Sequence, residues 1–299
     1  MKFDCALIGI GYWGSKLKKY IAESGLFNLK YACNSKSDLN EVWNDNTVTA
    51  IVNATPNEFH YEITKQALSH NKHVLTEKPL ALTTADCLEL EKLAKERNLK
   101  IQTNYIFNFS KALQVAQEWV ETGKIGELLG FEACVRHLGR FGGGSVYWLL
   151  GSHVLSVLDM FFPLQLLTFT QTPIVEHNGQ IETGIINFHS LKGSKKLNGQ
   201  IVASLNYPHK KLEIILYGET GTITYNPYSQ PIPLHAMKYK RLKWTTSDKI
   251  PQKADMYISD ESSNLRYTLE TFHNVLTNRK ESNLATAITI TKILEDIQK

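Results

Sequence analysis

A glycine-rich loop directly after a short apolar run is the feature that most constrains the fold of this chain. Residues 9–14 read GIGYWG, and the apolar residues 5–8 precede them. A strand, such a loop and the start of a helix, in this order, are typical of a dinucleotide-binding unit. We expect Gly9 to allow the tight turn, Gly11 to let the backbone approach a pyrophosphate, and Gly14 to let the helix pack closely on the strand.

The helix that follows this loop supplies the second part of the predicted site. Its first N–H groups have no partner inside the helix, and the helix dipole places positive charge there, so this end suits a phosphate group. Tyr12 and Trp13 lie between the last two glycines. We expect both side chains to contact the cofactor.

Apolar runs alternate with helical patterns through the first third of the chain. The runs predict strands at residues 5–8, 29–33, 50–54, 73–76 and 100–103, and helical patterns lie at residues 17–24, 61–69, 84–97 and 111–121. This alternation predicts a parallel sheet with helices on both faces. We therefore expect an α/β protein whose residues 1–120 form a Rossmann domain, a doubly wound parallel sheet that binds NAD(P).

Strand patterns dominate the rest of the chain. They lie at residues 130–136, 180–189, 199–206 and 211–217, with a helical segment at 146–162 and closing helices at 262–278 and 284–298. We expect residues 121–299 to form a C-terminal α+β domain, built on a mostly antiparallel sheet, that binds substrate and mediates oligomerisation.

Charge and cysteine usage exclude several classes of protein. The net charge is +4 over 299 residues with lysines and acids interspersed, so we expect no nucleic-acid partner. The chain has no run of about 18 apolar residues and its start lacks the pattern of a signal peptide, so we expect no membrane span. The four cysteines form no CxxC pair, which argues against a metal site or a disulfide framework and favours a reducing, cytoplasmic location.

The loop after the second predicted strand bears on the choice between NADP and NAD. About 20 residues past the glycine loop, an Asp or Glu usually bonds the adenine-ribose 2′-hydroxyl of NAD. Residues 33–36 read CNSK here, and the first acid is Asp38. Asn34 and Ser35 can bond a hydroxyl or a phosphate, and Lys36 adds positive charge. The loop therefore favours NADP over NAD as the cofactor.

Further motifs, taken in order, resemble those of the Gfo/Idh/MocA oxidoreductases. They are TPN at residues 55–57 with His60, EKP at 77–79, NYIFN at 104–108, GKIG at 123–126, and GGG at 142–144 leading into GSH at 151–153. With the glycine loop they cover essentially the whole chain. The resemblance implies a Rossmann dehydrogenase with a second α/β domain, which acts on a hydroxyl or ketone of a sugar, nucleotide sugar or cyclitol. It also implies a homodimer or homotetramer.

The resemblance assigns roles to residues at the carboxyl ends of the predicted parallel strands, where open α/β sheets bind ligands. Lys78 resembles the family's catalytic lysine, and a lysine partly desolvated beside the nicotinamide can act as acid–base with a lowered pKa. His153 matches the family's histidine in the second domain, which relays the proton or bonds the reacting hydroxyl. The implied cofactor contacts in this region are Thr55, Pro56, His60, Glu77, Lys78 and Asn104.

The substrate is expected to meet arginines and aromatic side chains close to these groups. Arginines suit phosphates or carboxylates through bidentate bonds, and aromatic faces suit a sugar ring or a base. A nucleotide sugar uses both. The predicted substrate contacts are Lys78, Tyr105, Arg136, Arg140, Tyr147, Trp148 and His153.

One departure from the family pattern leaves alternatives open. The family's Asp-x-Gly-x-His motif has an acid four residues before the histidine, and this chain has Leu149 there. A leucine neither accepts a proton nor bonds a sugar hydroxyl. Either Lys78 with His153 suffices, or Tyr147 or Tyr105 replaces the acid, or the chain is a cofactor-binding sensor or regulatory protein without turnover. A third hypothesis is glycoside cleavage in which the hydride is transferred and returned.

Overall fold

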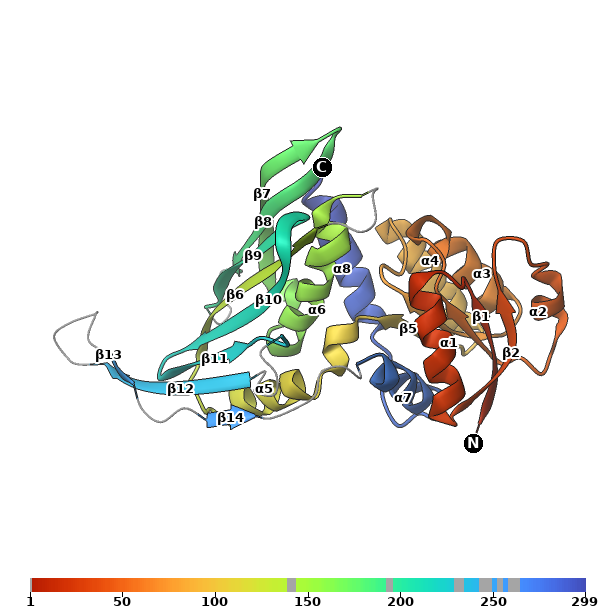
Figure 1. Cartoon of the computed structure of the whole chain (residues 1–299), viewed down its shortest axis with the longest axis horizontal. Helices are drawn as coiled ribbons and strands as arrows, with labels where there is room; N and C mark the ends of the chain where they lie inside the picture. The colour runs from red at the N-terminus through yellow and green to blue at the C-terminus, as the bar shows by residue number, and fades with distance from the viewer. Residues whose placement is uncertain are drawn as a thin grey trace. The chain divides into compact units, whose positions relative to one another are not determined.

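The chain folds into two compact units, each built on its own sheet (Figure 1). The first unit comprises residues 1–109, 263–297 and 299, and the second comprises residues 110–262 and 298. The computed structural model describes residues 2–138, 144–191, 196–228, 234–241, 249–251, 255–257 and 264–299. Every helix in these ranges is too short or too polar to span a bilayer.

The first unit contains a parallel sheet of five strands in the order β2-β1-β3-β4-β5. The strands are β1 (Phe3–Ile8), β2 (Phe27–Cys33), β3 (Ala50–Asn53), β4 (His73–Glu77) and β5 (Ile101–Asn104). Between them lie the helices α1 (Tyr12–Ser24), α2 (Asn40–Asn44), α3 (His60–Ser69) and α4 (Thr84–Glu96), with the short turns η1 (Asn57–Phe59) before α3 and η2 (Ile106–Phe109) after β5. The predicted Rossmann sheet is confirmed.

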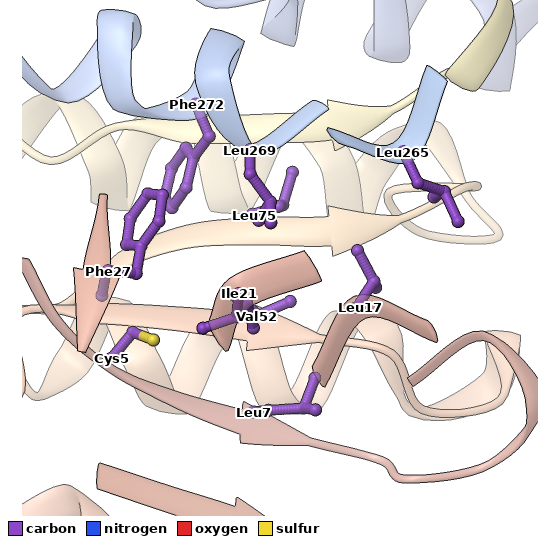
Figure 2. Close-up of a cluster of buried hydrophobic side chains, with 11 residues drawn as sticks. Cys5, Leu7, Leu17, Ile21, Phe27, Val52, Leu75, Leu265, Leu269 and Phe272 are labelled. Atoms are coloured by element: carbon purple, nitrogen blue, oxygen red, sulfur yellow. The ribbon is translucent and has the colours of Figure 1, made fainter. Parts of the chain in front are cut away.

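A helix from the end of the chain completes the core of this unit. Helix α7 (Asn264–Leu276) carries Leu265, Leu269 and Phe272 on one buried face, and all three point toward the strands in Figure 2. The Phe272 ring stacks on Phe27 with centroids 5.8 Å apart. The division at residue 120 assigned this helix to the second domain, but its contacts with α1 and η2 group it with the first unit. An amphipathic pattern shows that one helical face is buried but not which core it joins.

The segment before the last helix, α8 (Leu284–Asp296), protects the edge strand β5. The side chain of Asn283 accepts a hydrogen bond from the backbone N–H of Thr103 and donates one to its carbonyl, both at 2.8 Å. An edge strand otherwise exposes such groups. Further along, the Glu295 carboxylate accepts bonds from the backbone N–H and hydroxyl of Thr84, at 2.9 and 2.6 Å. Helix α8 thereby holds the start of α4.

The second unit is built on a mostly antiparallel sheet of nine strands, which confirms the predicted sheet. The strands are β6 (Leu128–Leu138), β7 (Leu167–His177), β8 (Gln180–Ser190), β9 (Asn198–Ser204), β10 (Asn206–Gly218), β11 (Gly221–Tyr225), β12 (Leu234–Arg241), β13 (Lys249–Pro251) and β14 (Asp255–Tyr257). Their order is β13-β12-β11-β10-β6-β9-β8-β7, and β14 pairs with β12. Strands β6 and β9 pair in parallel. The hydrophobic pattern of the sequence did not predict β7 or the strands after residue 218.

Helices α5 (Lys111–Glu121) and α6 (Ser152–Phe161) pack against this sheet. Residues 131, 133 and 135 of β6 are buried while their neighbours stay partly exposed, because successive side chains of a strand point to opposite faces. A π-helical turn, η3 (Tyr147–Gly151), leads into α6, where the sequence predicted one continuous helix over residues 146–162. A short turn, η4 (Leu164–Leu166), connects α6 to β7.

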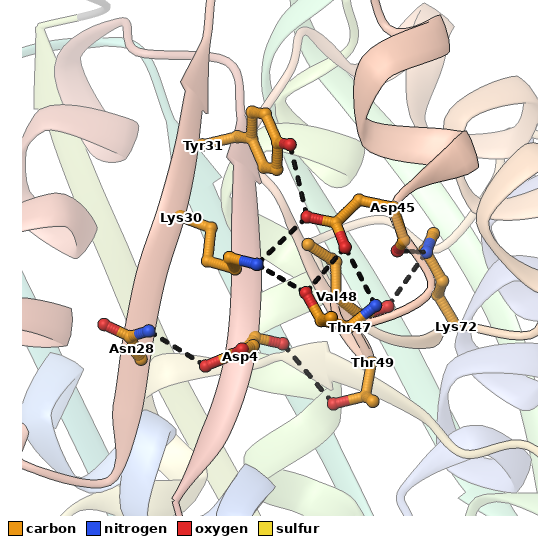
Figure 3. Close-up of polar contacts among 9 residues, drawn as sticks. All are labelled: Asp4, Asn28, Lys30, Tyr31, Asp45, Thr47, Val48, Thr49 and Lys72. Carbon is orange, nitrogen blue, oxygen red and sulfur yellow. Dashed lines mark hydrogen bonds and ion pairs between the residues drawn. The ribbon is translucent and has the colours of Figure 1, made fainter.

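A polar cluster fixes the turn between α2 and β3 in the first unit (Figure 3). The carboxylate of Asp45 accepts hydrogen bonds from the N–H and hydroxyl of Thr47, at 2.8 and 2.6 Å, and from Lys30 and Tyr31, at 3.1 and 3.2 Å. The bonds from Thr47, ahead of those from Lys30 and Tyr31, hold the pKa of Asp45 well below its usual range. The carboxylate is thereby kept charged at the amino-terminal edge of the sheet.

A buried lysine in the same cluster gives a test of its contribution to stability. Lys72 is 1% exposed, and its Nζ donates to the carbonyl oxygens of Asp45 and Val48, both at 2.8 Å. We expect Lys72→Met to lower the free energy of unfolding by about 1–3 kcal/mol, because a buried carbonyl loses its donor. Urea unfolding followed by circular dichroism measures the change. The same substitution at Lys92, whose side chain is 77% exposed, is the control; equal losses in both variants would contradict this prediction.

Candidate active site

The three glycines of the glycine-rich loop meet different surroundings at the carboxyl end of β1. Gly9 has φ +94°, and a Cβ there would lie 2.5 Å from the backbone of Ala54. A Cβ on Gly14 would lie 1.8 Å from the carbonyl oxygen of Gly9, whereas nothing lies within 4 Å of a Cβ built on Gly11. Packing within the protein therefore requires glycine at positions 9 and 14. Gly11 leaves open space beside the start of α1, which is what the approach of a pyrophosphate needs.

The first turn of α1 also suits an anionic cofactor. It contains no acidic residue, and its N-cap, Gly11, makes no side-chain capping bond, so no side chain of the cap or first turn competes for its N–H groups. The ammonium group of Lys16 lies 3.0 Å from Tyr12 Oη and sits 4.4 and 5.0 Å from the ring centroids of Tyr12 and Trp13. All three side chains are exposed. The residues of this loop therefore fit a dinucleotide.

Residues 34–37, in the loop after β2, carry hydrogen-bond donors and no carboxylate. The Asn34 side-chain oxygen accepts a bond from the N–H of Lys36 at 2.9 Å, and the Ser37 hydroxyl accepts one from the N–H of Asn34 at 3.0 Å. The Asn34 oxygen is thus used inside the turn, which leaves its NH₂ group to face outward with Ser35 and Lys36. The first acid, Asp38, accepts a bond from the N–H of residue 40 at 2.9 Å and so holds the start of α2.

Glu77 and Asn104 meet where the neighbouring strands β4 and β5 end. Nδ2 of Asn104 donates to Glu77 Oε1 at 2.7 Å, and Asn104 Oδ1 accepts a bond from the hydroxyl of Thr268 in α7 at 2.9 Å. Burial raises the pKa of Glu77 above its usual value. The bond from Asn104 and the charge of Lys78 act in the opposite direction without cancelling the rise. Asn104 was predicted as a cofactor contact; in the structure it orients the Glu77 carboxylate.

His60, also predicted as a cofactor contact, is enclosed by the protein. It is 0% exposed, with Nδ1 2.5 Å from the carbonyl oxygen of Pro79 and Nε2 2.9 Å from that of Thr55. Both ring nitrogens thus face backbone carbonyls, and no ring nitrogen is left to bind a cofactor. We correct the assignment: His60 connects the loop after β3, where Thr55 and the exposed Pro56 lie, with the loop after β4.

Lys78 lies directly after β4, next to Glu77 and before a cis peptide bond to Pro79. Burial lowers the pKa of Lys78 to about 8, and the Glu77 charge opposes this shift. A group with such a pKa gains and loses protons near neutral pH, as general acid–base catalysis requires. The Lys78 loop and the glycine loop both lie at the carboxyl ends of the parallel strands, the usual binding edge of an open α/β sheet.

Two tyrosines predicted to contact substrate are fully buried. Tyr105 and Tyr147 are each 0% exposed. The Tyr147 hydroxyl lies 3.1 Å from the side-chain oxygen of Gln171 and 3.3 Å from the carbonyl oxygens of Thr172 and Ile185. Burial raises the pKa of Tyr147 to about 12. A hydroxyl with this pKa stays protonated near neutral pH, so Tyr147 is a poor proton acceptor in place of the acid of the family motif.

The remaining predicted substrate residues lie in two places in the second unit. Trp148, Leu149 and His153 follow one another along η3 and the start of α6, and all three are partly exposed. Arg136 projects from the face of β6 opposite to the buried row at residues 131, 133 and 135, with its guanidinium 5.4 Å from the Tyr207 ring centroid. The structure therefore does not bring Arg136 beside His153. Arg140 lies outside the described residues.

Comparison with protein families identifies the first unit. Residues 22–105 match the GFO_IDH_MocA model, described as an oxidoreductase family with an NAD-binding Rossmann fold. Part of the Rossmann sheet is thus similar to the Gfo/Idh/MocA family. The matched region begins in the last turn of α1, ends one residue after β5, and includes His60, Glu77, Lys78 and Asn104.

A curated relative of this chain is the 2,7-anhydro-N-acetylneuraminate hydratase of Escherichia coli strain K12. The two are 30% identical over 137 residues, which are 41% of this chain and 37% of the relative. The chain thus spans little more than a third of the length of this relative.

Two solved structures are similar in fold over nearly the whole chain. KijD10, a 3-ketoreductase from Actinomadura kijaniata in complex with TDP-benzene and NADP, has a TM-score of 0.82 at 16% identity, with 99% of this chain and 96% of that chain covered. GenD2 from gentamicin A biosynthesis, in complex with NAD, has a TM-score of 0.82 at 18% identity, with 98% and 92% covered. The likeness shows that the fold of both units is shared.

Sequence reasoning missed three residues that shape this candidate site. Lys16 follows Tyr12 by four positions, a helical spacing that was available as a signal. Asn53 ends the apolar strand β3, where its oxygen accepts bonds from the hydroxyl and N–H of Thr55, at 2.7 and 3.3 Å. Thr268 reaches Asn104 from 164 residues away, and no local pattern indicates that contact.

Proposed function

We propose that this chain is an NAD(P)-dependent oxidoreductase that transfers a hydride to or from a hydroxyl or ketone carbon of a sugar, nucleotide sugar or cyclitol. The observation that carries the proposal is Lys78, whose pKa is lowered to about 8, on the same sheet edge as the glycine loop. The nicotinamide, when bound, supplies or accepts the hydride. A sugar hydratase among the relatives and a ketoreductase among the structural neighbours support the substrate class.

Lys78 moves the proton that accompanies hydride transfer. In the reducing direction its ammonium group donates a proton to the carbonyl oxygen, and in the oxidising direction its neutral amine accepts the proton of the hydroxyl. Glu77, oriented by Asn104, opposes the loss of the lysine charge and keeps its pKa from falling further. The roles of His153, to relay the proton or bond the reacting hydroxyl, and of Trp148, to contact the sugar, remain proposals from the sequence.

We propose NADP as the preferred cofactor because of the loop after β2. With its oxygen bonded to the Lys36 N–H, Asn34 has its NH₂ group left for a ligand, and Ser35 and Lys36 add a hydroxyl and a positive charge. Donors and a cation favour the 2′-phosphate, whereas the 2′-hydroxyl of NAD is usually bound by a carboxylate acceptor.

Fluorescence titration with NADPH and NADH tests the cofactor. We expect tighter binding of NADPH, and we expect Asn34→Asp to move the preference about tenfold or more toward NADH, because the new carboxylate repels the 2′-phosphate and accepts the 2′-hydroxyl. Asn44→Asp, an exposed change of the same charge at the end of α2, is the control. No affinity for either nucleotide would overturn the proposed function.

A turnover screen with keto-sugars and nucleotide-linked keto-sugars tests the reaction. Steady consumption of NADPH supports a reductase. Leu149, at the position of the family's acid, favours one other function, a cofactor-binding sensor, for which we expect nucleotide binding without turnover of any sugar. Sugar conversion without net NADPH consumption would indicate that the hydride is returned.

We also propose a homodimer or homotetramer in a reducing, cytoplasmic compartment. The face of β6 away from the buried row carries the partly exposed Glu132, Cys134 and Arg136 and is available for a second copy. All four cysteines are free thiols, which suits a reducing compartment. Light scattering of the purified chain measures the number of subunits.

A further inference from the structure

We propose that His60 is a positioning residue, which holds the Lys78 loop in place through a hydrogen bond from its Nδ1–H to the carbonyl oxygen of Pro79. The inference rests on the proposed function of Lys78 and adds a residue that touches neither cofactor nor substrate. It begins from the location of His60, which is 0% exposed at the start of α3 with each ring nitrogen against a backbone carbonyl.

The two carbonyls that face His60 belong to loops that follow different strands. Thr55 follows β3, and Pro79 follows β4 by two residues. The ring thus connects two loops at the edge of the sheet where Lys78 lies. Pro79 is the residue after Lys78, so a bond to its carbonyl helps to fix the position of the Lys78 loop, and a 1 Å misplacement of a reacting group can cost about 100-fold in rate.

The two contacts of the ring are not equivalent, because the two carbonyls differ in their other support. Thr55 is also held by Asn53, which accepts bonds from its hydroxyl and N–H at 2.7 and 3.3 Å. The amide group of Asn53 in turn donates to the carbonyl oxygen of His60 at 3.2 Å. Among the described residues, the side chain that faces the carbonyl oxygen of Pro79 is His60, through Nδ1. Loss of the Nδ1 bond therefore frees the Lys78 loop, while loss of the Nε2 contact leaves Thr55 in place.

The number of protons on the imidazole ring bears on which contact is a hydrogen bond, and it favours the contact with Pro79. An imidazolium donates to both carbonyls, and a neutral ring has one donor only. The pKa of His60 lies below its usual value because the ring is buried, and the charge of Lys78 lowers it further. The hydrogen bonds to the two carbonyls and the charge of Glu58 oppose this shift. When the neutral ring keeps a single proton, the shorter contact, 2.5 Å against 2.9 Å, places that proton on Nδ1.

Two substitutions separate the two contacts. Asn at position 60 keeps a donor near the place of Nδ1, and Gln keeps one near the place of Nε2. We expect His60→Asn to retain kcat within about threefold and His60→Gln to lower kcat about 10- to 100-fold, with the Kd for NADPH unchanged in both. Equal kcat values in the two variants, or a loss in His60→Asn alone, would overturn the inference.

Nuclear magnetic resonance of the wild-type protein gives a readout that depends on neither folding of the variants nor turnover. Long-range ¹H–¹⁵N correlation of the His60 ring identifies which nitrogen carries the proton, and we expect it on Nδ1 at neutral pH. A bare Nδ1 would exclude the proposed bond. Wild-type titration with NADPH separates the two proposals: failure to bind contradicts the proposed function, whereas binding and turnover with equal variants contradict only the role of His60.

Discussion

Alanine at position 11 is expected to leave the fold intact and to weaken NADPH binding about 100-fold or more, equivalent to about 2.7 kcal/mol. Gly11 has an extended backbone that any residue adopts, with φ −73° and ψ −155°, and a Cβ there meets no protein atom within 4 Å. The added methyl group instead occupies the space that the pyrophosphate needs. Fluorescence titration measures the affinity, and thermal unfolding without cofactor measures the stability.

The control for this prediction is the same substitution three residues later. A Cβ on Gly14 would lie 1.8 Å from the carbonyl oxygen of Gly9, a backbone atom that cannot rotate away. We therefore expect Gly14→Ala to destabilise the first unit by about 3 kcal/mol or more, so that its loss of binding accompanies a loss of fold. If Gly11→Ala bound NADPH as well as wild type, the cofactor would not lie against this loop.

Replacing Lys78 by methionine is expected to lower kcat by about 10²- to 10⁴-fold, the usual contribution of a general acid–base group. Methionine keeps the volume of the side chain, so folding is expected to change little, and the Kd for NADPH, measured in parallel, separates loss of the proton donor from loss of the predicted cofactor contact. Lys78→Arg is expected to be nearly as slow, because arginine keeps the charge but does not release a proton near neutral pH. Steady-state kinetics with the sugar found in the screen measures kcat, and Lys92→Met serves as the surface control.

The dependence of kcat on pH in the wild type tests the acid–base role of Lys78 without a substitution. Lys78, with a pKa of about 8, is an ammonium group below that pH and a neutral amine above it. Ketone reduction needs the ammonium as proton donor, so its kcat is expected to fall as the pH rises through about 8. Hydroxyl oxidation needs the amine, so its kcat is expected to rise through the same pH. Profiles that move together in both directions, or full activity in Lys78→Met, would remove Lys78 from the mechanism.

The candidate site shows where sequence reasoning succeeds and where it stops. Residues close together in the chain, such as the three glycines and the Glu77–Lys78 pair, were found because turn geometry and strand ends are local properties. His60 and Asn104 were noticed, yet their protein partners were not predicted: sequence shows that a polar residue lies near a strand end but not which protein groups take its hydrogen bonds. The burial of Tyr147, a predicted substrate contact, was likewise not visible in the sequence.

The order of apolar runs, glycines and helical patterns determined by itself that this chain has an N-terminal parallel Rossmann sheet and a second, mostly antiparallel sheet. These features follow from short-range periodicity and from the few residue types that allow a tight strand–helix turn. Only the tertiary structure decided that α7 returns to the first core, that Thr268 orients Glu77 through Asn104, and that His60 faces two carbonyls. Such contacts join residues far apart in the chain, and they depend on how whole elements pack.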